Sequence, residues 1–240
     1  MEVTSGFIHN NQYSLSIRFS SDGFSLCIYD EVDHLISKKR VDQSLFLLKE
    51  NAIYELIANE VETQLEFKNI RLICESDIYT LVPDVFFTPE MVCDYLYFDR
   101  EKNKNDSELF SQLTVWENTL IYSLPTHLQN AINRVYPNKH IEHHLTLFLS
   151  EIANDRNESG LKIWTRQKKL DVAVITNGKL TLLNSYNYNT PEDYTFFVLN
   201  IFEQLSLDTE TCKVEIYNLD NNSEIKNLLQ IYVKELMVVN

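Results

Sequence analysis

The fold is decided by residues 170–205, which read LDVAVITNGKLTLLNSYNYNTPEDYTFFVLNIFEQL. Apolar and β-favouring residues alternate with polar ones on both sides of Asn177-Gly178, a dipeptide typical of a type I′ hairpin turn. Thr190 then supplies a helix cap and Pro191 occupies the first helical position. The apolar residues that follow share one helix face: Tyr194, Phe197, Val198, Ile201, Phe202 and Leu205. This stretch predicts a strand pair that leads into an amphipathic helix.

The same order of elements is expected twice along the chain. In the first half we expect three strands, an apolar helix stripe and a further strand, at residues 13–20, 24–29, 35–41, 45–57 and 70–74. In the second half the same order is expected at residues 161–167, 170–176, 179–186, 191–205 and 213–217. Hairpins that lead into a helix and a further strand predict mixed α/β sheets with helices packed on them. The sequence therefore predicts two similar lobes, at 1–125 and 126–240, with a boundary between 125 and 160.

Further signals define the elements around this repeat. Asp42 is placed to cap the first helix, Thr88-Pro89 to open another, and Ser223 to cap a final helix whose apolar face continues to Leu236. A buried strand and two short helices are expected at residues 120–124, 128–135 and 145–152. Residues 99–107 are polar throughout and predict a solvated loop.

Composition limits the partners and the compartment. The 240 residues include 35 acidic and 21 basic side chains, for a net charge of -14, which repels nucleic acid and anionic membrane surfaces. We therefore expect no nucleic-acid partner and no membrane insertion. The N-terminal residues lack a signal-peptide pattern, and the four cysteines are far apart and without zinc-ligand spacing. These features predict a cytoplasmic protein with buried thiols, without disulfides or bound metal.

The layout of two such lobes resembles the actin-like ATPase superfamily, in which a ribonuclease H-like lobe is duplicated. Within it, NSYNYNTPEDYTFFVLNIFEQLSLD (184–208) and WENTLIYSLP (116–125) resemble an uncharacterised family from Bacteroidetes-type bacteria, a domain of unknown function. The resemblance implies a two-lobed α/β fold over nearly the whole chain. It also implies a phosphate-binding hairpin in each lobe, typically with an Asp, glycines and Thr or Ser.

The matching turns retain little of that machinery. The first reads Ser20-Ser21-Asp22-Gly23 and the second reads Arg166-Gln167-Lys168-Lys169, which has neither acid nor glycine. The adenosine-side turn, usually rich in paired glycines, reads Asn218-Leu219-Asp220-Asn221-Asn222. The whole chain has 4 glycines, whereas loops that wrap phosphates need residues without a Cβ atom so that backbone amides approach the ligand. We therefore read Asp22-Gly23 as a hairpin turn.

We expect a non-catalytic protein, a pseudo-ATPase without cofactor, that binds or scaffolds a protein partner or associates as a homodimer. The alternative is a divergent ATPase or phosphotransferase that binds ATP and magnesium between the lobes. Asp22 would then be the metal-associated acid, and Lys168 or Lys169 the phosphate partner. The candidate binding residues for that alternative are Ser20, Ser21, Asp22, Gly23, Lys168 and Lys169.

Three other clusters have two interpretations each. His140, Glu142, His143 and His144 have metal-ligand spacing, but a surface strand or turn entering the helix at Leu145 is the simpler interpretation. Arg166, Lys168 and Lys169 with Lys162 form either an anion-binding patch or a solvated hairpin tip. Phe196 and Tyr188 lie off the main apolar stripe and are candidates for an exposed patch.

Overall fold

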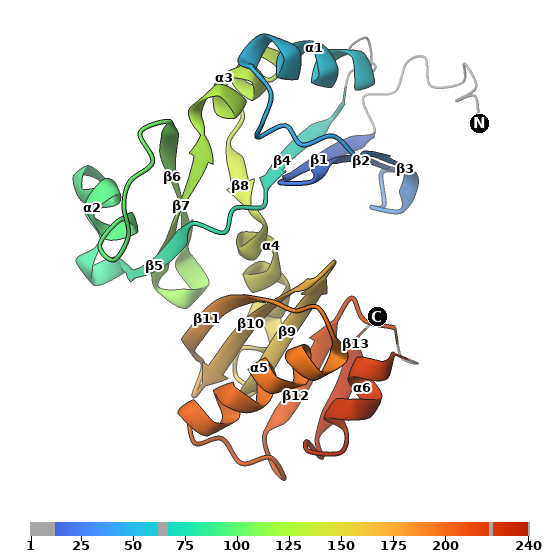
Figure 1. Cartoon of the computed structure of the whole chain (residues 1–240), viewed down its shortest axis with the longest axis vertical. Coiled ribbons are helices and arrows are strands. Elements are labelled where there is room, and N and C mark those ends of the chain that lie inside the picture. Colours follow the sequence, from blue (N-terminus) through green and yellow to red (C-terminus); the bar gives the residue numbers. More distant parts are fainter. Residues whose placement is uncertain (1–12, 62–66, 221–222, 240) are drawn as a thin grey trace. The chain divides into compact units, whose positions relative to one another are not determined.

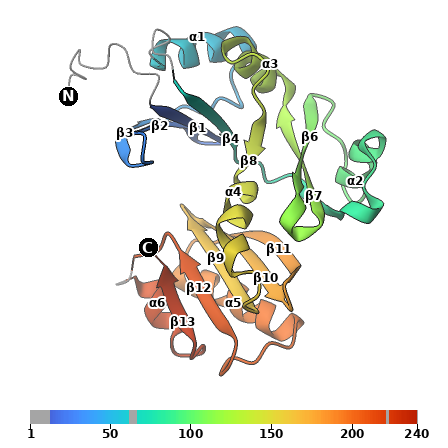
Figure 2. The same cartoon turned by 180° about the vertical axis from the view of Figure 1, so that it is seen from behind.

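The structure, a computed structural model, describes residues 13–61, 67–220 and 223–239. They divide into two units, drawn in Figure 1 and, from behind, in Figure 2. The first unit takes its described residues from Met1–Leu113 and Glu117–Thr146, and the second from Thr114–Trp116 and Leu147–Asn240. Each unit is built around its own five-stranded sheet.

The sheet of the first unit has the strand order β3-β2-β1-β4-β8. Its strands are β1 (Ser14–Ser20), β2 (Gly23–Tyr29), β3 (Leu35–Val41), β4 (Asn69–Cys74) and β8 (Ile141–His143). The pairs β1–β2 and β2–β3 are antiparallel, whereas β1, β4 and β8 are parallel. Parallel neighbours need crossover connections, and helices α1 (Glu50–Glu60) and α3 (Thr126–Val135), which pack on each other, lie within these connections.

The sheet of the second unit has the order β11-β10-β9-β12-β13. Its strands are β9 (Gly160–Arg166), β10 (Lys169–Thr176), β11 (Lys179–Asn187), β12 (Lys213–Tyr217) and β13 (Leu236–Val239). Helices α5 (Pro191–Gln204) and α6 (Glu224–Leu229) bury their apolar side chains, including Val198, Ile201 and Leu229, against one face of this sheet. Removing these side chains from water is the main favourable term in the folding of the unit.

The two sheets have one topology. In each, two antiparallel hairpin strands follow the first strand, and two further strands lie parallel to it on its other side. The repeated order predicted from the sequence is therefore confirmed. Each repeat contains one further strand: β8, in the run 140–144 where a strand or turn was expected, and β13, which was not predicted.

The first unit carries an insertion between β4 and α3 that has no counterpart in the second. Its elements are β5 (Tyr79–Pro83), η1 (Asp84–Phe86), η2 (Pro89–Met91), α2 (Val92–Leu96), β6 (Asp106–Leu113) and β7 (Asn118–Pro125); η3 (Thr114–Trp116), between β6 and β7, is counted with the second unit. The strands form an antiparallel sheet in the order β5-β7-β6. Val82, Val92, Leu96 and Ile121 form a small core between this sheet and α2. The expected strand at 120–124 is part of β7, whereas β5 and β6 were not predicted.

Helix α4 (His144–Glu151) follows β8 and is continued by η4 (Ile152–Asp155). The apolar stripe predicted for it is confirmed, because Leu145, Phe148, Leu149 and Ile152 are all fully buried. The division between the two units falls within this helix.

The helix caps predicted at Thr190 and Ser223 and the turn predicted at Asn177-Gly178 are confirmed. The Thr190 side chain accepts a hydrogen bond from the Asp193 amide, and the Asp193 carboxylate in turn accepts one from the Thr190 amide, which completes a capping box. Ser223 caps α6 in the same way through the Lys226 amide. Asn177 and Gly178 have φ values of 51° and 76°, as a type I′ turn requires.

Two element boundaries were predicted wrongly. Asp42 does not cap a helix. Its carboxylate accepts a hydrogen bond from Arg40 Nε (2.6 Å), and α1 begins further along the chain, at Glu50. The last helix ends at Leu229, and Leu236 lies in β13, parallel to β12. A short apolar run does not distinguish a helix from a buried strand.

The four cysteines, which were expected to be buried, differ in their exposure. Cys74 is fully buried, and burial raises the pKa of its thiol, whereas Cys27, Cys93 and Cys212 are half-buried. Among the helices of the described ranges, none is both long enough and apolar enough to span a membrane.

Candidate functional site

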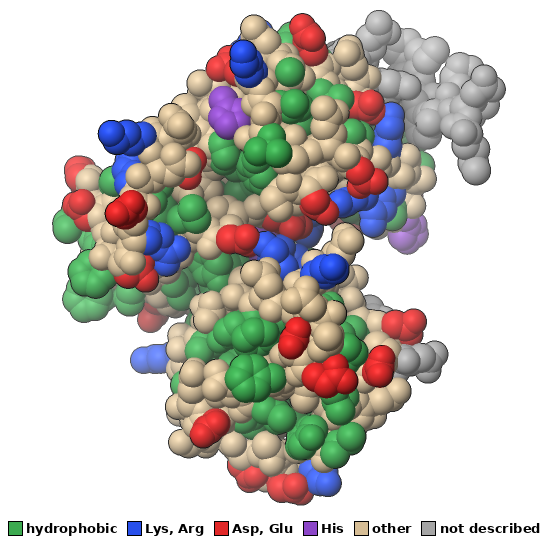
Figure 3. Space-filling view, viewed as in Figure 1, with side chains coloured by type: hydrophobic (Ala, Val, Ile, Leu, Met, Phe, Trp, Pro, Cys, Tyr) green, Lys and Arg blue, Asp and Glu red, His purple; other side chains and the backbone are tan. Residues whose placement is uncertain are grey.

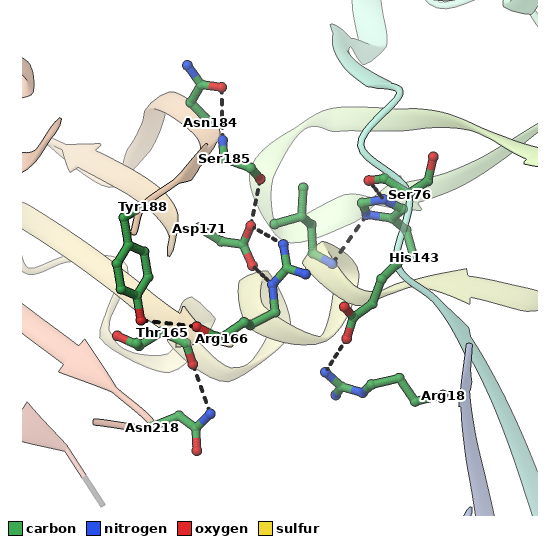
Figure 4. Close-up of polar contacts among 12 residues, drawn as sticks. Arg18, Ser76, His143, Thr165, Arg166, Asp171, Asn184, Ser185, Tyr188 and Asn218 are labelled. Carbon is green, nitrogen blue, oxygen red and sulfur yellow. Dashed lines mark hydrogen bonds and ion pairs between the residues drawn. The ribbon is translucent and has the colours of Figure 1, made fainter. Parts of the chain in front are cut away.

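In open α/β sheets, ligands bind outside the carboxyl ends of the parallel strands. In the first unit these ends bring Ser20 of β1, Ser76 after β4 and His143 of β8 to one edge of the sheet. In the second unit they bring Arg166 of β9 and Asn218, after β12, to the equivalent edge. Figure 4 shows polar contacts at both edges.

At the first edge, the hairpin between β1 and β2 is held together by its own side chains. Ser20 Oγ donates to Asp22 Oδ1 (2.6 Å) and lies 3.0 Å from the Gly23 carbonyl oxygen. Arg40 Nη2, from β3, donates to Asp22 Oδ2 (2.6 Å). The Ser20 hydrogen bond, together with the Arg40 charge, holds the pKa of Asp22 below its ordinary value. Both Asp22 oxygens are therefore committed within the sheet, and a metal ion at Asp22 would compete with Arg40.

Gly23 is required here by space. A Cβ atom on Gly23 would lie 2.2 Å from the Val41 carbonyl oxygen of β3. The glycine thus allows two protein backbones to approach each other closely. A phosphate-binding loop uses glycine for a similar reason, because a residue without a Cβ atom lets the backbone approach the phosphate. Ser21, beside it, is exposed at the turn.

At the second edge, Gln167 and Lys168 form the turn between β9 and β10. Lys168 is exposed, has a φ of 57°, and its carbonyl accepts a hydrogen bond from the Tyr188 amide (3.0 Å). Lys169 is half-buried at the start of β10. The structure brings Ser20, Asp22 and Gly23 together in one turn and Lys168 and Lys169 together in another.

The sequence analysis missed a buried acid beside this second turn. Asp171, on β10, is fully buried and forms a bidentate ion pair with Arg166, through Nε to Oδ2 (2.6 Å) and Nη2 to Oδ1 (2.8 Å) (Figure 4). Ser185 Oγ donates to the same Asp171 Oδ1 (2.6 Å). Planar, bidentate geometry makes this one of the stronger kinds of ion pair. Strand alternation was the available signal, since Asp171 pairs directly with Ser185 and lies diagonally to Arg166.

Neither interpretation of the basic cluster, an anion-binding patch or a solvated hairpin tip, is correct for Arg166 and Lys162. Arg166 is neutralised by Asp171, and Lys162 is almost fully buried, with Nζ 2.5 Å from Glu215 Oε1 on the neighbouring strand β12. Tyr217 donates from its hydroxyl to Glu215 Oε2 (2.8 Å), and burial together with that carboxylate raises the pKa of the tyrosine. These charges lie inside the second unit and form no anion-binding surface.

The third expected turn follows β12. Asn218 adopts a φ of 59°, and its side-chain amide donates to the Thr165 carbonyl oxygen (2.8 Å) (Figure 4). Asn218 thereby ties the end of β12 to the end of β9. Asn221 and Asn222 lie outside the described residues.

The histidine run 140–144 is built into the first unit. His143 is fully buried on β8; its Nδ1 accepts from the Leu145 amide (3.3 Å) and its Nε2 lies 2.9 Å from the Ser76 carbonyl oxygen (Figure 4). That carbonyl can only accept, so His143 carries its proton on Nε2, and both ring nitrogens are used by the backbone. His140 Nε2 lies 3.2 Å from Ser111 Oγ. The surface position expected for this run is thus wrong for His143 and for His144, which is also buried. In the ranges that the structure covers, no group of three or more His, Cys, Asp or Glu could hold a metal ion.

Comparison with known proteins places this geometry in a family. The model of a family described as "Protein of unknown function (DUF3822)" matches residues 4–236. A crystal structure from Bacteroides thetaiotaomicron, of a protein with actin-like ATPase fold and unknown function, superposes with a TM-score of 0.82 at 23% sequence identity, covering 99% of this chain and 94% of that one. The PilM-PilN type IV pilus biogenesis complex matches with a TM-score of 0.55 at 11% identity, over 95% of this chain and 88% of that one. Among functionally curated proteins, no match is found.

Proposed function

The chain belongs to the DUF3822 family of proteins of unknown function with an actin-like ATPase fold, and from that premise we propose that it acts by binding a protein partner rather than by hydrolysing a nucleotide. One observation carries the proposal. The acids beside the two hairpins that would hold a metal and phosphates are already committed to side chains of the same unit, Asp22 to Ser20 and Arg40, and Asp171 to Arg166 and Ser185.

Phosphoryl transfer depends on a metal ion and on donors positioned around the transferred group. To bind Mg²⁺, Asp22 would have to hold the metal beside the positive charge of Arg40, which ion-pairs with both Asp22 and Asp42 and would be repelled by the metal. Asp171 has no exposed surface, and freeing it would leave the Arg166 guanidinium buried without its counter-charge. Nucleotide hydrolysis would therefore cost interactions that stabilise each unit, whereas protein binding costs none of them.

The fold is compatible with this function. PilM, which shares the fold at low sequence identity, forms a complex with PilN in type IV pilus biogenesis. We propose a partner-binding role of this general kind for the present chain, without an inferred link to pili. A scaffold role in the cytoplasm agrees with the acidic charge of -14, since a high net charge keeps a protein soluble.

A thermal-shift titration with ATP, ADP and Mg²⁺ tests the proposal. A ligand that binds the folded state raises the Tm, so we expect no shift even at about 1 mM nucleotide. A saturable rise at micromolar ATP would overturn the proposal in favour of a divergent nucleotide-binding protein. In that case Asp22→Asn should abolish the rise, and Lys168→Ala should reduce it, because these residues are the metal and phosphate partners of the alternative.

A further inference from the structure

The insertion of the first unit presents a connected set of apolar side chains to solvent. We define the aromatic patch as Val85, Phe86, Phe87, Met91, Tyr95 and Phe110. Val85, Phe86, Met91 and Phe110 are exposed. The Phe87 ring lies 5.1 Å from the Phe110 ring and 6.4 Å from that of Tyr95. Figure 3 shows hydrophobic side chains gathered in this region, at the left of the view where Figure 1 places α2.

The patch is held in place from below. Tyr95 donates a hydrogen bond to the Phe86 carbonyl oxygen (2.5 Å), and the same hydroxyl lies 3.8 Å from Met91 Sδ. Beneath it, α2 is anchored by Val92 and Leu96 in the small core of the insertion. Large apolar side chains on a fixed support mark binding surfaces, since leaving them in water has a cost that binding removes.

The charged side chains within residues 84–98, which carry five of the six patch residues, are all acidic. The exposed acids within residues 84–101 are Asp84, Glu90, Asp94, Asp99 and Glu101. The basic side chains of the same insertion are Arg100, which ion-pairs with Asp99, Lys102, which ion-pairs with Glu108, and Lys104, which is exposed; all three lie outside residues 84–98. A segment bound on the patch therefore meets a negative border, formed by Asp84, Glu90 and Asp94.

The negative charge of the chain and of the border favours one class of binding partner for the aromatic patch over the others. A second copy of this chain would bring the same negative border and a further net charge of -14, which opposes self-association through this surface. An anionic membrane is repelled for the same reason. We propose that the aromatic patch docks a peptide segment of another protein in which bulky apolar residues are accompanied by Lys or Arg. The proposal names the partner class for the protein-binding function above and rests on that function.

The test is selection of peptides by the full chain. A phage-displayed library of linear peptides of about 12 residues, the length of a typical recognition segment, is panned on the immobilised protein. Enriched peptides are synthesised with a fluorescent label, and their Kd is measured by anisotropy. We expect sequences that combine bulky apolar residues with Lys or Arg, and binding that weakens several-fold between about 50 and about 300 mM salt because exposed charges are screened.

Two matched variants locate the binding. Phe86→Ser removes a side chain that is 70% exposed, and Phe196→Ser removes one that is 64% exposed on α5 of the second unit. Neither should change the Tm measurably, since neither ring is in a core. We expect Kd to rise tenfold or more for Phe86→Ser and to stay within about twofold for Phe196→Ser. Asp94→Lys, which reverses one charge of the border, should weaken basic peptides several-fold and provides a second readout if Phe86→Ser alters folding.

The outcomes separate the two proposals. Peptides that bind equally to wild type, Phe86→Ser and Asp94→Lys would overturn the aromatic patch as the docking site and leave the protein-binding function standing. Failure to enrich any peptide, or enrichment of acidic ones, would also overturn the patch proposal. A Tm rise with micromolar ATP, measured separately, would overturn the proposed function.

Discussion

The β1–β2 and β9–β10 hairpins occupy equivalent places in the two sheets but hold their acids differently. In the first, Asp22 lies at the turn with its side chain 57% exposed, and its partner Arg40 is 42% exposed. In the second, Asp171 lies inside the strand with no exposed side-chain surface, and Arg166 is 8% exposed. The two sheets have the same topology, yet the ion pair beside this hairpin is solvated in the first unit and buried in the second. The acid beside the first hairpin is therefore part of the core in only one of the two units.

Loss of the buried acid should have the largest effect. Asp171→Ala leaves the Arg166 guanidinium buried without a counter-charge, and we expect a loss of about 3–5 kcal/mol in the free energy of unfolding. Urea denaturation measures it. The double variant Arg166→Leu/Asp171→Leu should recover much of the loss, because no unpaired charge remains. A double variant as unstable as the single one would show that the ion pair is not the cause.

Gly23→Ala tests whether close backbone packing, and not an ion pair, stabilises the first hairpin. The new Cβ would lie 2.2 Å from the Val41 carbonyl oxygen, so the backbone of β3 has to move. We expect a loss of about 1–3 kcal/mol, the usual range for overpacking. The same denaturation experiment applies, and an unchanged midpoint would contradict the close approach of β2 and β3 at this position.

The second hairpin of each unit offers a further contrast. Between β2 and β3, Asp30 Oδ1 accepts the amides of Val32 (3.0 Å) and His34 (2.8 Å), whereas Asn177-Gly178 makes a tight turn between β10 and β11. Gly178→Ala has room, with the nearest atom 3.8 Å from the new Cβ, but its φ of 76° is unfavourable for alanine. We expect a loss of roughly 1–2 kcal/mol by thermal or chemical denaturation. Gly178→Asn is the control and should lose less, because asparagine tolerates this region.

The exposed acid should have the smallest effect. Asp22→Asn should cost less than about 1 kcal/mol, since solvent screens the pair with Arg40. The folded-state pKa of Asp22 is lowered, so its contribution is present above the ordinary pKa of 3.8 and is lost as pH falls through the folded value. Denaturation of wild type and Asp22→Asn should therefore differ at pH 7 and converge in acid. A constant difference across that range would exclude Asp22 as the titrating group.

The expected division into ribonuclease H-like lobes at 1–125 and 126–240 stays a prediction. Limited proteolysis followed by mass spectrometry would test it, because cleavage between residues 125 and 160 should release two fragments if a linker lies there.

Features with a short-range cause could be predicted from the sequence, and those that depend on register could not. The turn at Asn177-Gly178 and the caps at Thr190 and Ser223 were all correct, because each depends on a residue's own backbone preference or on an amide within three residues. The missed strand β13 shows the limit. Its apolar residues continued the helical spacing of the preceding segment, and only pairing with β12 makes them a strand.

The candidate site divides in the same way. Turn chemistry predicted that Ser20, Asp22 and Gly23 belong to one hairpin turn, and composition showed that the chain has few glycines for phosphate-binding loops. The buried pairs Arg166–Asp171 and Lys162–Glu215 were misjudged because charged side chains are rarely buried. Strand alternation places Arg166 and Asp171 on one face of their hairpin, but the local sequence does not show that they are buried there. The order of strands and helices therefore follows from local preferences and apolar periodicity. Which charges become part of the core was decided when the sheets brought distant residues into register, since the cost of burying a charge is removed only by a counter-charge in contact with it.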